Sequence, residues 1–352
     1  MNNNKWFTTI FFSSFFLLLA VIAGLTIYID PFFHYHAPLE KYEYPINVPR
    51  YQNDGITRNF SYDAVVTGTS MVEPFSISCV NQAFGVNAIK VCYSGAGYKE
   101  INETIRLAIK RNPNVKMVIR GLDYQSLTED KDFEKYDNLP TYLYNENPFD
   151  DVSYVFNKEV LFFRTLHVID FTKNGGVTTT FDQYSLPNDP FGKEYALSYY
   201  ERPKKIKKKE KKLSEEVKKR ELENIKQNVS STIIENPDVE FYLFFCPYSI
   251  LYWDKTYRNG GLKQHIEKER VAIEELLQYE NVHLFSFDTN IEFNISLDHY
   301  RDTTHYDQYS TAFLIDYLAT GKYELTKENY EAYLEEVYNL YKNYDYDKIF
   351  EK

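Results

Sequence analysis

Cysteine is scarce in this chain of 352 residues, and its three copies lie far apart at Cys79, Cys92 and Cys246. An odd, sparse set without CxxC spacing excludes a disulfide framework and a cysteine-based zinc site. The sequence also lacks a phosphate-binding P-loop, a Rossmann glycine pattern and any cluster with metal-ligand spacing. We therefore expect no organic cofactor and no required metal.

Basic residues are outnumbered, with 40 Lys and Arg against 51 Asp and Glu and a net charge of -11. This balance argues against nucleic acid as a partner. Residues 202–220 are the exception, because 11 basic residues stand there beside 3 acidic ones. Such a run is usually a solvated helix face, and contact with anionic lipid or a polyanionic wall polymer is the second interpretation.

Tryptophan is rare, with 2 copies, whereas the chain holds 33 Tyr and 26 Phe. Tyrosine suits carbohydrate binding, because its ring stacks on a sugar while its hydroxyl stays hydrated. A biased, AT-rich genome would give the same enrichment. The aromatic excess is therefore compatible with a cell-surface polysaccharide partner without requiring one.

Charge is absent from the long apolar run between Trp6 and Ile29. About 20 such residues span a bilayer, and a cleaved signal peptide usually has a shorter apolar region of about 7–15. We therefore expect an uncleaved, single-pass anchor. Because Lys5 precedes the run and Asp30 follows it, the positive-inside rule places the N-terminus in the cytoplasm and the bulk of the chain outside.

The chain divides into four parts by composition. They are a cytoplasmic tip with the anchor at 1–29, a juxtamembrane collar at 30–60, an α/β domain at 61–324 and a C-terminal amphipathic helix at 325–352. In the collar, His34 and His36 form an HxH pair without a third ligand at an obvious spacing, so we favour an interfacial role over a metal site. His265 falls in a helix pattern and is interpreted as structural or exposed.

Five short apolar runs in the domain predict β-strands, and helix patterns follow several of them. The predicted strands are Tyr62–Thr67, Asn87–Tyr93, Val115–Ile119, Val239–Cys246 and Val282–Phe287. This alternation indicates a three-layer α/β/α fold with a parallel five-stranded sheet. The interval 125–237 between the third and fourth strands is too long for a simple connection. We expect it to form a lid or side subdomain over the carboxyl edge of the sheet.

The stretch AVVTGTSMVEP places Ser70 where the first predicted strand ends. Ligands usually bind at the carboxyl ends of strands in an open α/β sheet, so this serine is either a helix N-cap or a nucleophile. A nucleophile needs a base, and Asp302 and His305 supply DxxH spacing near the end of the domain. That spacing lets the carboxylate orient the imidazole toward a serine. The adjacent pair Asp298 and His299 is the alternative.

With a serine after the first strand and DxxH near the end, the chain resembles the SGNH/GDSL hydrolase superfamily over roughly residues 62–321. The resemblance implies that Ser70 is the nucleophile, His305 the general base and Asp302 its orienting partner. It also implies an oxyanion hole that includes the amide of Ser70.

The other family blocks supply the remaining oxyanion donors. The YSGAG segment offers the amide of Gly95, with Gly97 as the next choice. The third family block is Gly-x-Asn-Asp, but here it reads GLDY, with Asp123 at the position of the donor asparagine. A carboxylate accepts hydrogen bonds, so Asp123 could join the hole only when protonated.

The anchor, the outward SGNH-like domain and the GTS motif together resemble the branch of that superfamily that handles acyl groups on surface glycans. This implies a serine-dependent acyl esterase or O-acyltransferase, with a multispanning membrane acyl-transfer protein as partner. Tyr252 and Trp253 follow the fourth predicted strand and are substrate-binding candidates, with simple packing as the alternative. The competing hypothesis is a non-catalytic, SGNH-fold subunit for glycan binding or envelope assembly.

Overall fold

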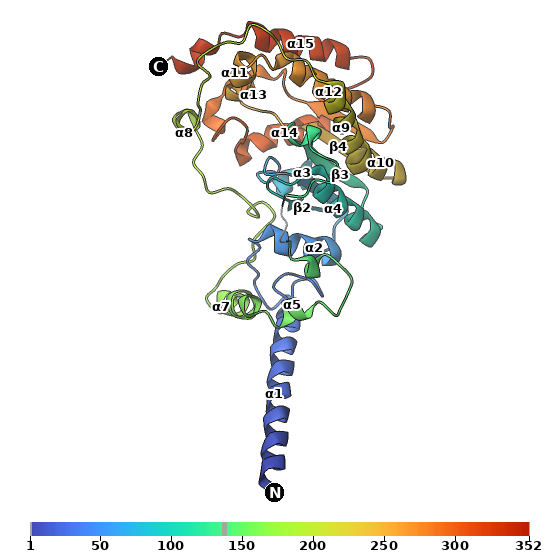
Figure 1. Ribbon diagram of the computed structural model, residues 1–352, viewed down its shortest axis with the longest axis vertical. Helices are drawn as coiled ribbons and strands as arrows, with labels where there is room; N and C mark the ends of the chain where they lie inside the picture. The colour runs from blue at the N-terminus through green and yellow to red at the C-terminus, as the bar shows by residue number, and fades with distance from the viewer. Residues whose placement is uncertain (1, 136–138, 352) are drawn as a thin grey trace. The chain divides into compact units, whose positions relative to one another are not determined.

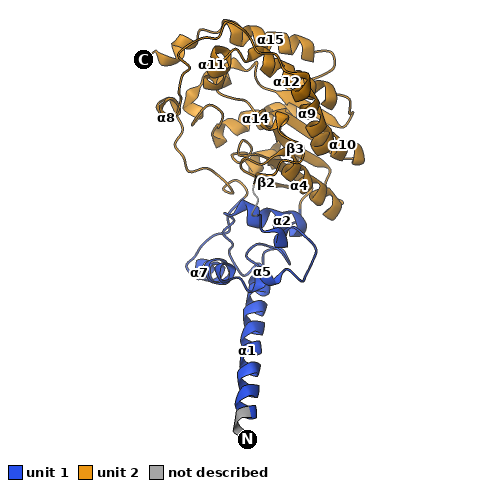
Figure 2. Cartoon of the chain, in the orientation of Figure 1, with its two compact units in different colours: residues 1–61, 136–180 blue, residues 62–135, 181–352 orange. Residues whose placement is uncertain are grey.

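The computed structural model describes residues 2–135 and 139–351, which form two compact units (Figure 2). Unit 1 comprises Met1–Ser61 and Tyr136–Thr180, and unit 2 comprises Tyr62–Lys135 and Phe181–Lys352. The interval predicted as one insertion, 125–237, is thus divided between the two units. Its middle part joins the N-terminal segment, whereas its two ends belong to the α/β unit.

Unit 1 begins with the apolar helix α1 (Asn2–Ile29). Within its segment Lys5–Ile29, a window of 18 residues has a mean hydropathy of 2.5, and the helix is long and apolar enough to cross a membrane. The residue after the helix, Asp30, adopts a φ of 47°, and its carboxylate accepts the backbone N–H groups of three residues that follow. Burial raises the pKa of Asp30 against the lowering effect of these bonds and of the Tyr154 hydroxyl.

The rest of unit 1 is built from short helices. They are α2 (Pro49–Asn59), η2 (Thr141–Leu143), α5 (Val152–Val155), α6 (Lys158–Val160), η3 (Leu161–Thr165) and α7 (Leu166–Lys173). The HxH histidines do not converge in it. His34 Nε2 lies 3.1 Å from Asp151 Oδ1, whereas the nitrogens of His36 face the carbonyl oxygens of Ala37 and Ile27 at 2.6 and 3.0 Å.

Unit 2 is an α/β unit around a six-stranded mixed sheet (Figure 1). Its strands are β1 (Ala64–Gly68), β2 (Ala88–Cys92), β3 (Met117–Leu122), β4 (Glu240–Phe245), β5 (Val282–Ser286) and β6 (Glu324–Leu325), in the order β2-β1-β3-β4-β5-β6. All five predicted runs form strands, and these five are parallel. The predicted count of five was wrong, because β6 pairs antiparallel with β5 and its two residues are too short to show a pattern.

The helices of unit 2 connect and cover these strands. They are α3 (Ile77–Phe84), α4 (Tyr98–Arg111), η1 (Ser126–Thr128), α8 (Lys193–Ser198), α9 (Glu215–Ile225), η4 (Lys226–Ser230), α10 (Ser231–Glu235), α11 (Ile250–Arg258), α12 (Leu262–Leu276), α13 (Ile291–Ile295), η5 (Leu297–His299), α14 (Gln308–Thr320), α15 (Tyr330–Asn343) and η6 (Tyr346–Phe350). Within the predicted C-terminal helix 325–352, the α-helix itself is α15, and η6 follows it.

Both faces of the sheet are buried, and two buried cations show which helices cover each face. Thr67 lies in register with Arg120, and its neighbour Val66 with Lys90, so the two cations point to opposite faces. Arg120 donates to a carbonyl in η4, on the face covered by α4. Lys90 donates to carbonyls just before α3, which packs against α14 on the other face.

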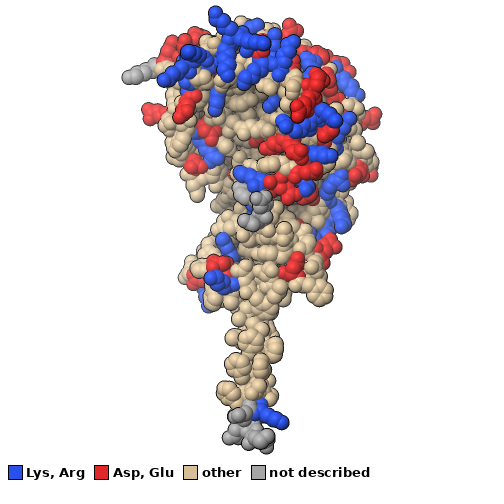
Figure 3. All heavy atoms as spheres, viewed as in Figure 1, with Lys and Arg blue, Asp and Glu red and all other residues tan. Residues whose placement is uncertain are grey.

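The basic segment 202–220 is only partly helical. Its exposed lysines up to position 212 lie in irregular chain, and α9 begins after Ser214, whose side chain accepts the N–H of Val217 as an N-cap. Through η4 and α10 this helix leads to β4, as a crossover must. In Figure 3, Lys and Arg side chains gather over unit 2 at the top of the view.

Candidate active site

The turn after β1 presents Ser70 at the carboxyl edge of the sheet. A Cβ on Gly68 or on Gly121 of β3 would lie 2.4 Å from Cγ2 of Val72, so glycines at both positions let Val72 pack under the turn. Ser70 is not a helix cap. The next helix, α3, begins seven residues later and has Ser76 as its N-cap. The N-cap interpretation of Ser70 is therefore excluded.

Ser70, His305 and Asp302 form one hydrogen-bonded row. Ser70 Oγ lies 2.9 Å from His305 Nε2, and His305 Nδ1 lies 2.7 Å from Asp302 Oδ2. With the Nδ1 proton donated to the carboxylate, Nε2 is left to accept the proton of the serine hydroxyl. The alternative histidine, His299, bonds instead to Asp307 at 2.9 Å, so the DxxH pair is the one that reaches the serine.

Asp302 is held in its ionised form. Its Oδ1 accepts the backbone N–H groups of Thr304 and His305, both at 2.8 Å. Burial acts to raise the pKa of Asp302, but the hydrogen bond and charge of His305 and these two backbone bonds outweigh it and hold the pKa well below its ordinary value. A permanent carboxylate here can orient the imidazole and stabilise the imidazolium that forms when it takes a proton.

Backbone pairing closes the loop that carries both residues. Tyr300 and Tyr306, which are almost fully buried, form an antiparallel bridge, and the N–H of Arg301 donates to the carbonyl of His305 at 3.0 Å. Ser249, which follows β4, donates its hydroxyl to the carbonyl oxygens of Asp302 and Thr303 at 3.2 and 2.9 Å. The loop that carries His305 is thus held both by its own backbone pairing and by Ser249 after β4.

Lys90 supports the chain that follows Ser70, and the sequence did not single it out. Its side chain is fully buried, and its ammonium donates to the carbonyl oxygens of Glu73 and Phe75 at 2.5 and 3.1 Å. Burial lowers the pKa of Lys90 to about 8. The one available signal was a charged residue inside the apolar run NAIKVCY.

Two backbone amides at this edge are open for an oxyanion. Neither the N–H of Ser70 nor that of Gly95 has a hydrogen-bond partner among residues 2–135 and 139–351. They follow the neighbouring strands β1 and β2, whose last residues, Gly68 and Cys92, are in register. Gly95 is exposed and has a φ of 65°, which favours glycine, whereas the N–H of Gly97 is engaged by Glu100 at 3.2 Å.

Asp123 accepts hydrogen bonds rather than donating them. Its carboxylate accepts the hydroxyl of Thr69 at 3.1 Å, the N–H of Gln125 at 3.0 Å and the hydroxyl of Tyr248. The suggested donor role in the oxyanion hole therefore has no support in this arrangement. Because Thr69 adjoins the nucleophile, Asp123 braces the turn that carries Ser70.

The two aromatic candidates after β4 differ in exposure. Trp253 is fully buried, and its ring stacks on Tyr341 of α15 with centroids 3.7 Å apart, so the predicted substrate platform is wrong for this residue. Tyr252 is half-buried and lines a pocket of about 330 Å³ together with Gln125 and Thr303. This pocket borders the loop of the base.

No family model, no curated protein and no solved structure matches this chain. The chemistry of the site therefore rests on its geometry. A serine hydroxyl paired to an oriented imidazole, beside two unengaged amides, has the parts needed for nucleophilic attack on a carbonyl and for stabilising the resulting oxyanion.

Proposed function

We propose that this protein is an extracytoplasmic, serine-dependent acyl esterase or O-acyltransferase that acts on a cell-surface glycan. The observation that carries the proposal is the continuous row from Ser70 Oγ through His305 to Asp302, with distances of 2.9 and 2.7 Å. Ser70 lies near the start of unit 2 in the sequence, and Asp302 and His305 lie more than 200 residues later. The three side chains meet at the carboxyl edge of the sheet, where ligands bind in open α/β folds.

In this mechanism, Ser70 Oγ attacks the ester carbonyl while His305 Nε2 takes the hydroxyl proton. Asp302 stabilises the imidazolium, and the amides of Ser70 and Gly95 receive the oxyanion. His305 then returns the proton to the leaving alcohol, which leaves an acyl-serine. Attack by water on this ester gives an esterase, whereas attack by a glycan hydroxyl gives an acyltransferase.

The SGNH-like assignment and the membrane setting belong to the same proposal. A serine directly after the first of five parallel strands, and DxxH before the last long helix of the sheet, support an SGNH-like unit. Lys5 before the apolar part of α1 supports an N-terminus in the cytoplasm and unit 2 outside. A multispanning membrane protein is then the natural source of an acyl group.

One observation favours a second candidate, a non-catalytic glycan-binding or envelope-assembly subunit. Asp123 stands where the superfamily has a donor asparagine, and it accepts three hydrogen bonds. Loss of one oxyanion donor typically lowers turnover by about 10²–10³. This site is therefore compatible both with a slow enzyme and with a protein that has no catalytic activity.

The test is intact-mass spectrometry of the full chain in detergent after exposure to p-nitrophenyl acetate. We expect a single acetyl adduct in the wild type and in Ser76→Ala, which loses the α3 cap, but none in Ser70→Ala. The adduct lifetime with and without added wall glycan then separates transferase from esterase. Folded wild type without an adduct or turnover would favour the non-catalytic subunit.

A further inference from the structure

A second histidine–carboxylate cluster lies inside unit 2, away from Ser70. His265 and Glu269 are one turn apart on α12, and Asp288 follows β5 by two residues. The three side chains are 4%, 0% and 1% exposed, and one ligand atom from each lies within 4.8 Å of the others. No other group of three His, Cys, Asp or Glu side chains in the described part of the chain converges in this way.

Each of the three side chains keeps one buried polar atom without a hydrogen-bond partner. These atoms are His265 Nε2, Glu269 Oε2 and Asp288 Oδ1. His265 Nε2 points into the cluster, since it lies 3.9 Å from Asp288 Oδ2. Buried polar atoms are nearly always satisfied, so three orphans in one place indicate a missing partner.

The other atoms of the cluster are fixed by hydroxyl groups. The hydroxyl of Tyr252 lies 3.0 Å from His265 Nδ1. Glu269 Oε1 accepts hydroxyl groups at 3.0 and 2.7 Å. A third hydroxyl lies 3.0 Å from Glu269 Oε1 and 2.7 Å from Asp288 Oδ2, and it can donate its one proton to the nearer Asp288. The three donors are the side chains of Tyr124, Ser286 and Tyr333. Metal-binding side chains are commonly oriented in this way through their non-ligating atoms.

The cluster also lacks positive charge. No Lys or Arg in the described residues forms an ion pair with Glu269 or Asp288. A buried carboxylate without a counter-charge is costly, and a cation would remove that cost.

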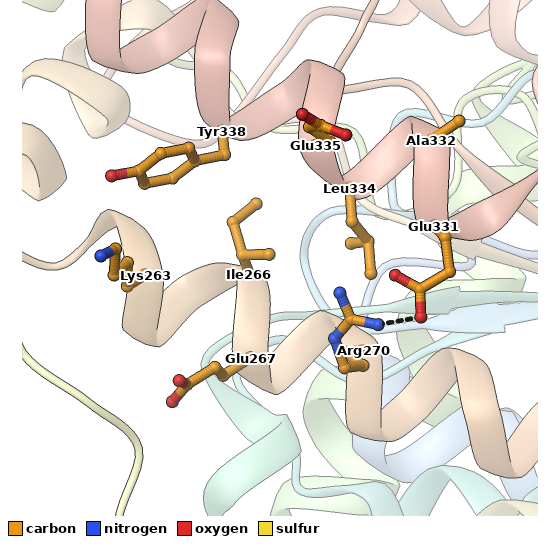
Figure 4. A pocket seen from close by; sticks show the side chains of 9 residues that line it. All are labelled: Lys263, Ile266, Glu267, Arg270, Glu331, Ala332, Leu334, Glu335 and Tyr338. Atoms are coloured by element: carbon orange, nitrogen blue, oxygen red, sulfur yellow. Dashed lines mark hydrogen bonds and ion pairs between the residues drawn. The ribbon is translucent and has the colours of Figure 1, made fainter.

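The two faces of α12 show the contrast. Lys263, Ile266 and Arg270 lie on its outer face and line a groove of about 600 Å³ between α12 and α15, where Arg270 pairs with Glu331 (Figure 4). The carboxylate of Glu331 thus has a cationic partner. On the inner face, the buried Glu269 has none.

We infer that His265, Glu269 and Asp288 form a binding site for one divalent transition-metal ion, with Zn²⁺ as the ion that best suits one imidazole and two carboxylates. Metal–ligand bonds of about 2.0–2.2 Å require the ligand atoms to approach one another by about an ångström. The ion would link α12 to the end of β5. His265 also lines the pocket that holds Lys211, Lys255 and Lys268, so we expect a folded chain to exchange the ion slowly.

The test measures metal in the full chain in detergent. We expect about one equivalent of Zn²⁺ by elemental mass spectrometry when zinc is supplied during expression. Unfolding in chelator and refolding with Co²⁺ should give one bound Co²⁺ with visible d–d absorption. Asp288→Asn and His265→Gln should lose at least 10-fold in metal affinity.

The matched control is His283→Gln. His283 also lies between two carboxylates, Glu324 and Glu240, but both of its nitrogens are engaged, at 2.8 and 3.3 Å. It should therefore keep the full metal content. Less than a tenth of an equivalent of Zn²⁺ in the wild type, together with no Co²⁺ absorption after refolding, would overturn the inference and leave a proton-sharing acid pair. These wild-type readings decide the question even where a variant fails to fold.

Discussion

Two histidines in unit 2 lie beside carboxyl groups, and their surroundings give them opposite properties. The side chain of His305 is 25% exposed, with one nitrogen on Asp302 and the other on a serine hydroxyl. His265 is buried, with one nitrogen on Tyr252 and the other unpartnered beside two carboxyl groups. A solvent-accessible row of hydrogen bonds, such as that of His305, can pass a proton to a substrate. Buried polar atoms without hydrogen-bond partners, such as Nε2 of His265, are instead suited to bind a metal ion. Residue types alone would not have separated the two.

The largest expected effect comes from breaking the hydrogen-bonded row of Ser70, His305 and Asp302. Ser70→Ala should reduce hydrolysis of p-nitrophenyl acetate to the uncatalysed rate, because no other hydroxyl is paired to His305 Nε2 in the described residues.

Asp302→Asn should lower turnover by about 10²–10⁴, because its amide group can present a donor to the Nδ1 proton and upset the tautomer. The double variant should be no slower than Ser70→Ala alone, since the groups act as a unit. Turnover that persists in Ser70→Ala would contradict the assignment.

The next effect concerns packing beneath the buried histidine. The ring of Trp253 lies 4.7 Å from that of His265 and stacks on Tyr341. Trp253→Ala should lower the free energy of unfolding by about 3–5 kcal/mol, because a large cavity is left in the core. Urea unfolding followed by circular dichroism measures this, with Tyr199→Ala as an exposed aromatic control. Full stability with weakened glycan binding would restore Trp253 as a substrate platform.

A buried carboxyl group without a hydrogen-bond partner gives a pH-dependent effect, because the charge of Lys268 opposes the cost of its burial only in part. Glu221 of α9 is fully buried, both of its oxygens lack partners, and burial raises its pKa from 4.5 to about 8. The folded chain therefore binds more protons than the unfolded chain between these values, and this contribution to stability is lost as the pH rises through about 8. Glu221→Gln should therefore be more stable than wild type above pH 8, by about 1.4 kcal/mol for each pH unit between the two pKa values and so by at most about 5 kcal/mol.

The same pair of proteins supplies the control for that measurement. Below about pH 4.5, Glu221 is protonated in both the folded and the unfolded state, so the wild type and Glu221→Gln should unfold at the same urea concentration. A difference that does not change with pH would mean that the substitution acts through packing rather than charge.

The smallest effect tests the oxyanion amide. Gly95→Ala places a side chain at a φ of 65° and should lower the free energy of unfolding by about 1 kcal/mol. Its Cβ would lie 2.0 Å from Lys135 Nζ, so the end of that flexible side chain must also move aside. The substitution should also slow acylation, because the amide that receives the oxyanion shifts. Gly85→Ala, at a φ of 66° with open space around it, has the same backbone cost away from the site. Equal acylation rates in the two variants would remove Gly95 from the oxyanion hole.

The sequence was most informative where pattern and chemistry are local. Apolar runs of five to eight residues predicted all five parallel strands to within three residues at each end, because such strands are buried on both faces. Ser70 was predicted from its place at a strand end, and the DxxH pair from its spacing and its place near the end of the domain. The parallel register of β1 and β2 then explains why Gly95 comes near the turn after β1.

What was missed depends on contacts that are distant in sequence. The helix α2 has no apolar period, since it buries polar residues such as Gln52 and Asn53, and no helix was therefore predicted in the collar. The cluster of His265, Glu269 and Asp288 joins a helix to the segment after a strand. Asp288 lies 19 positions after Glu269 in the sequence. The cluster's one local signal was the spacing of four between His265 and Glu269, which puts both on one helix face.

The bridge between Tyr300 and Tyr306 has a consequence for motion. It closes the intervening five residues into a short ring that contains both Asp302 and His305. Thermal displacement then carries acid and imidazole together, whereas Ser70 belongs to a separate turn and moves independently. On warming, the contact between serine and imidazole should become intermittent well before the contact between imidazole and carboxylate does. His305 would keep its orientation toward Asp302 while its contact with Ser70 breaks, so that the contact can form again without reorientation of the imidazole.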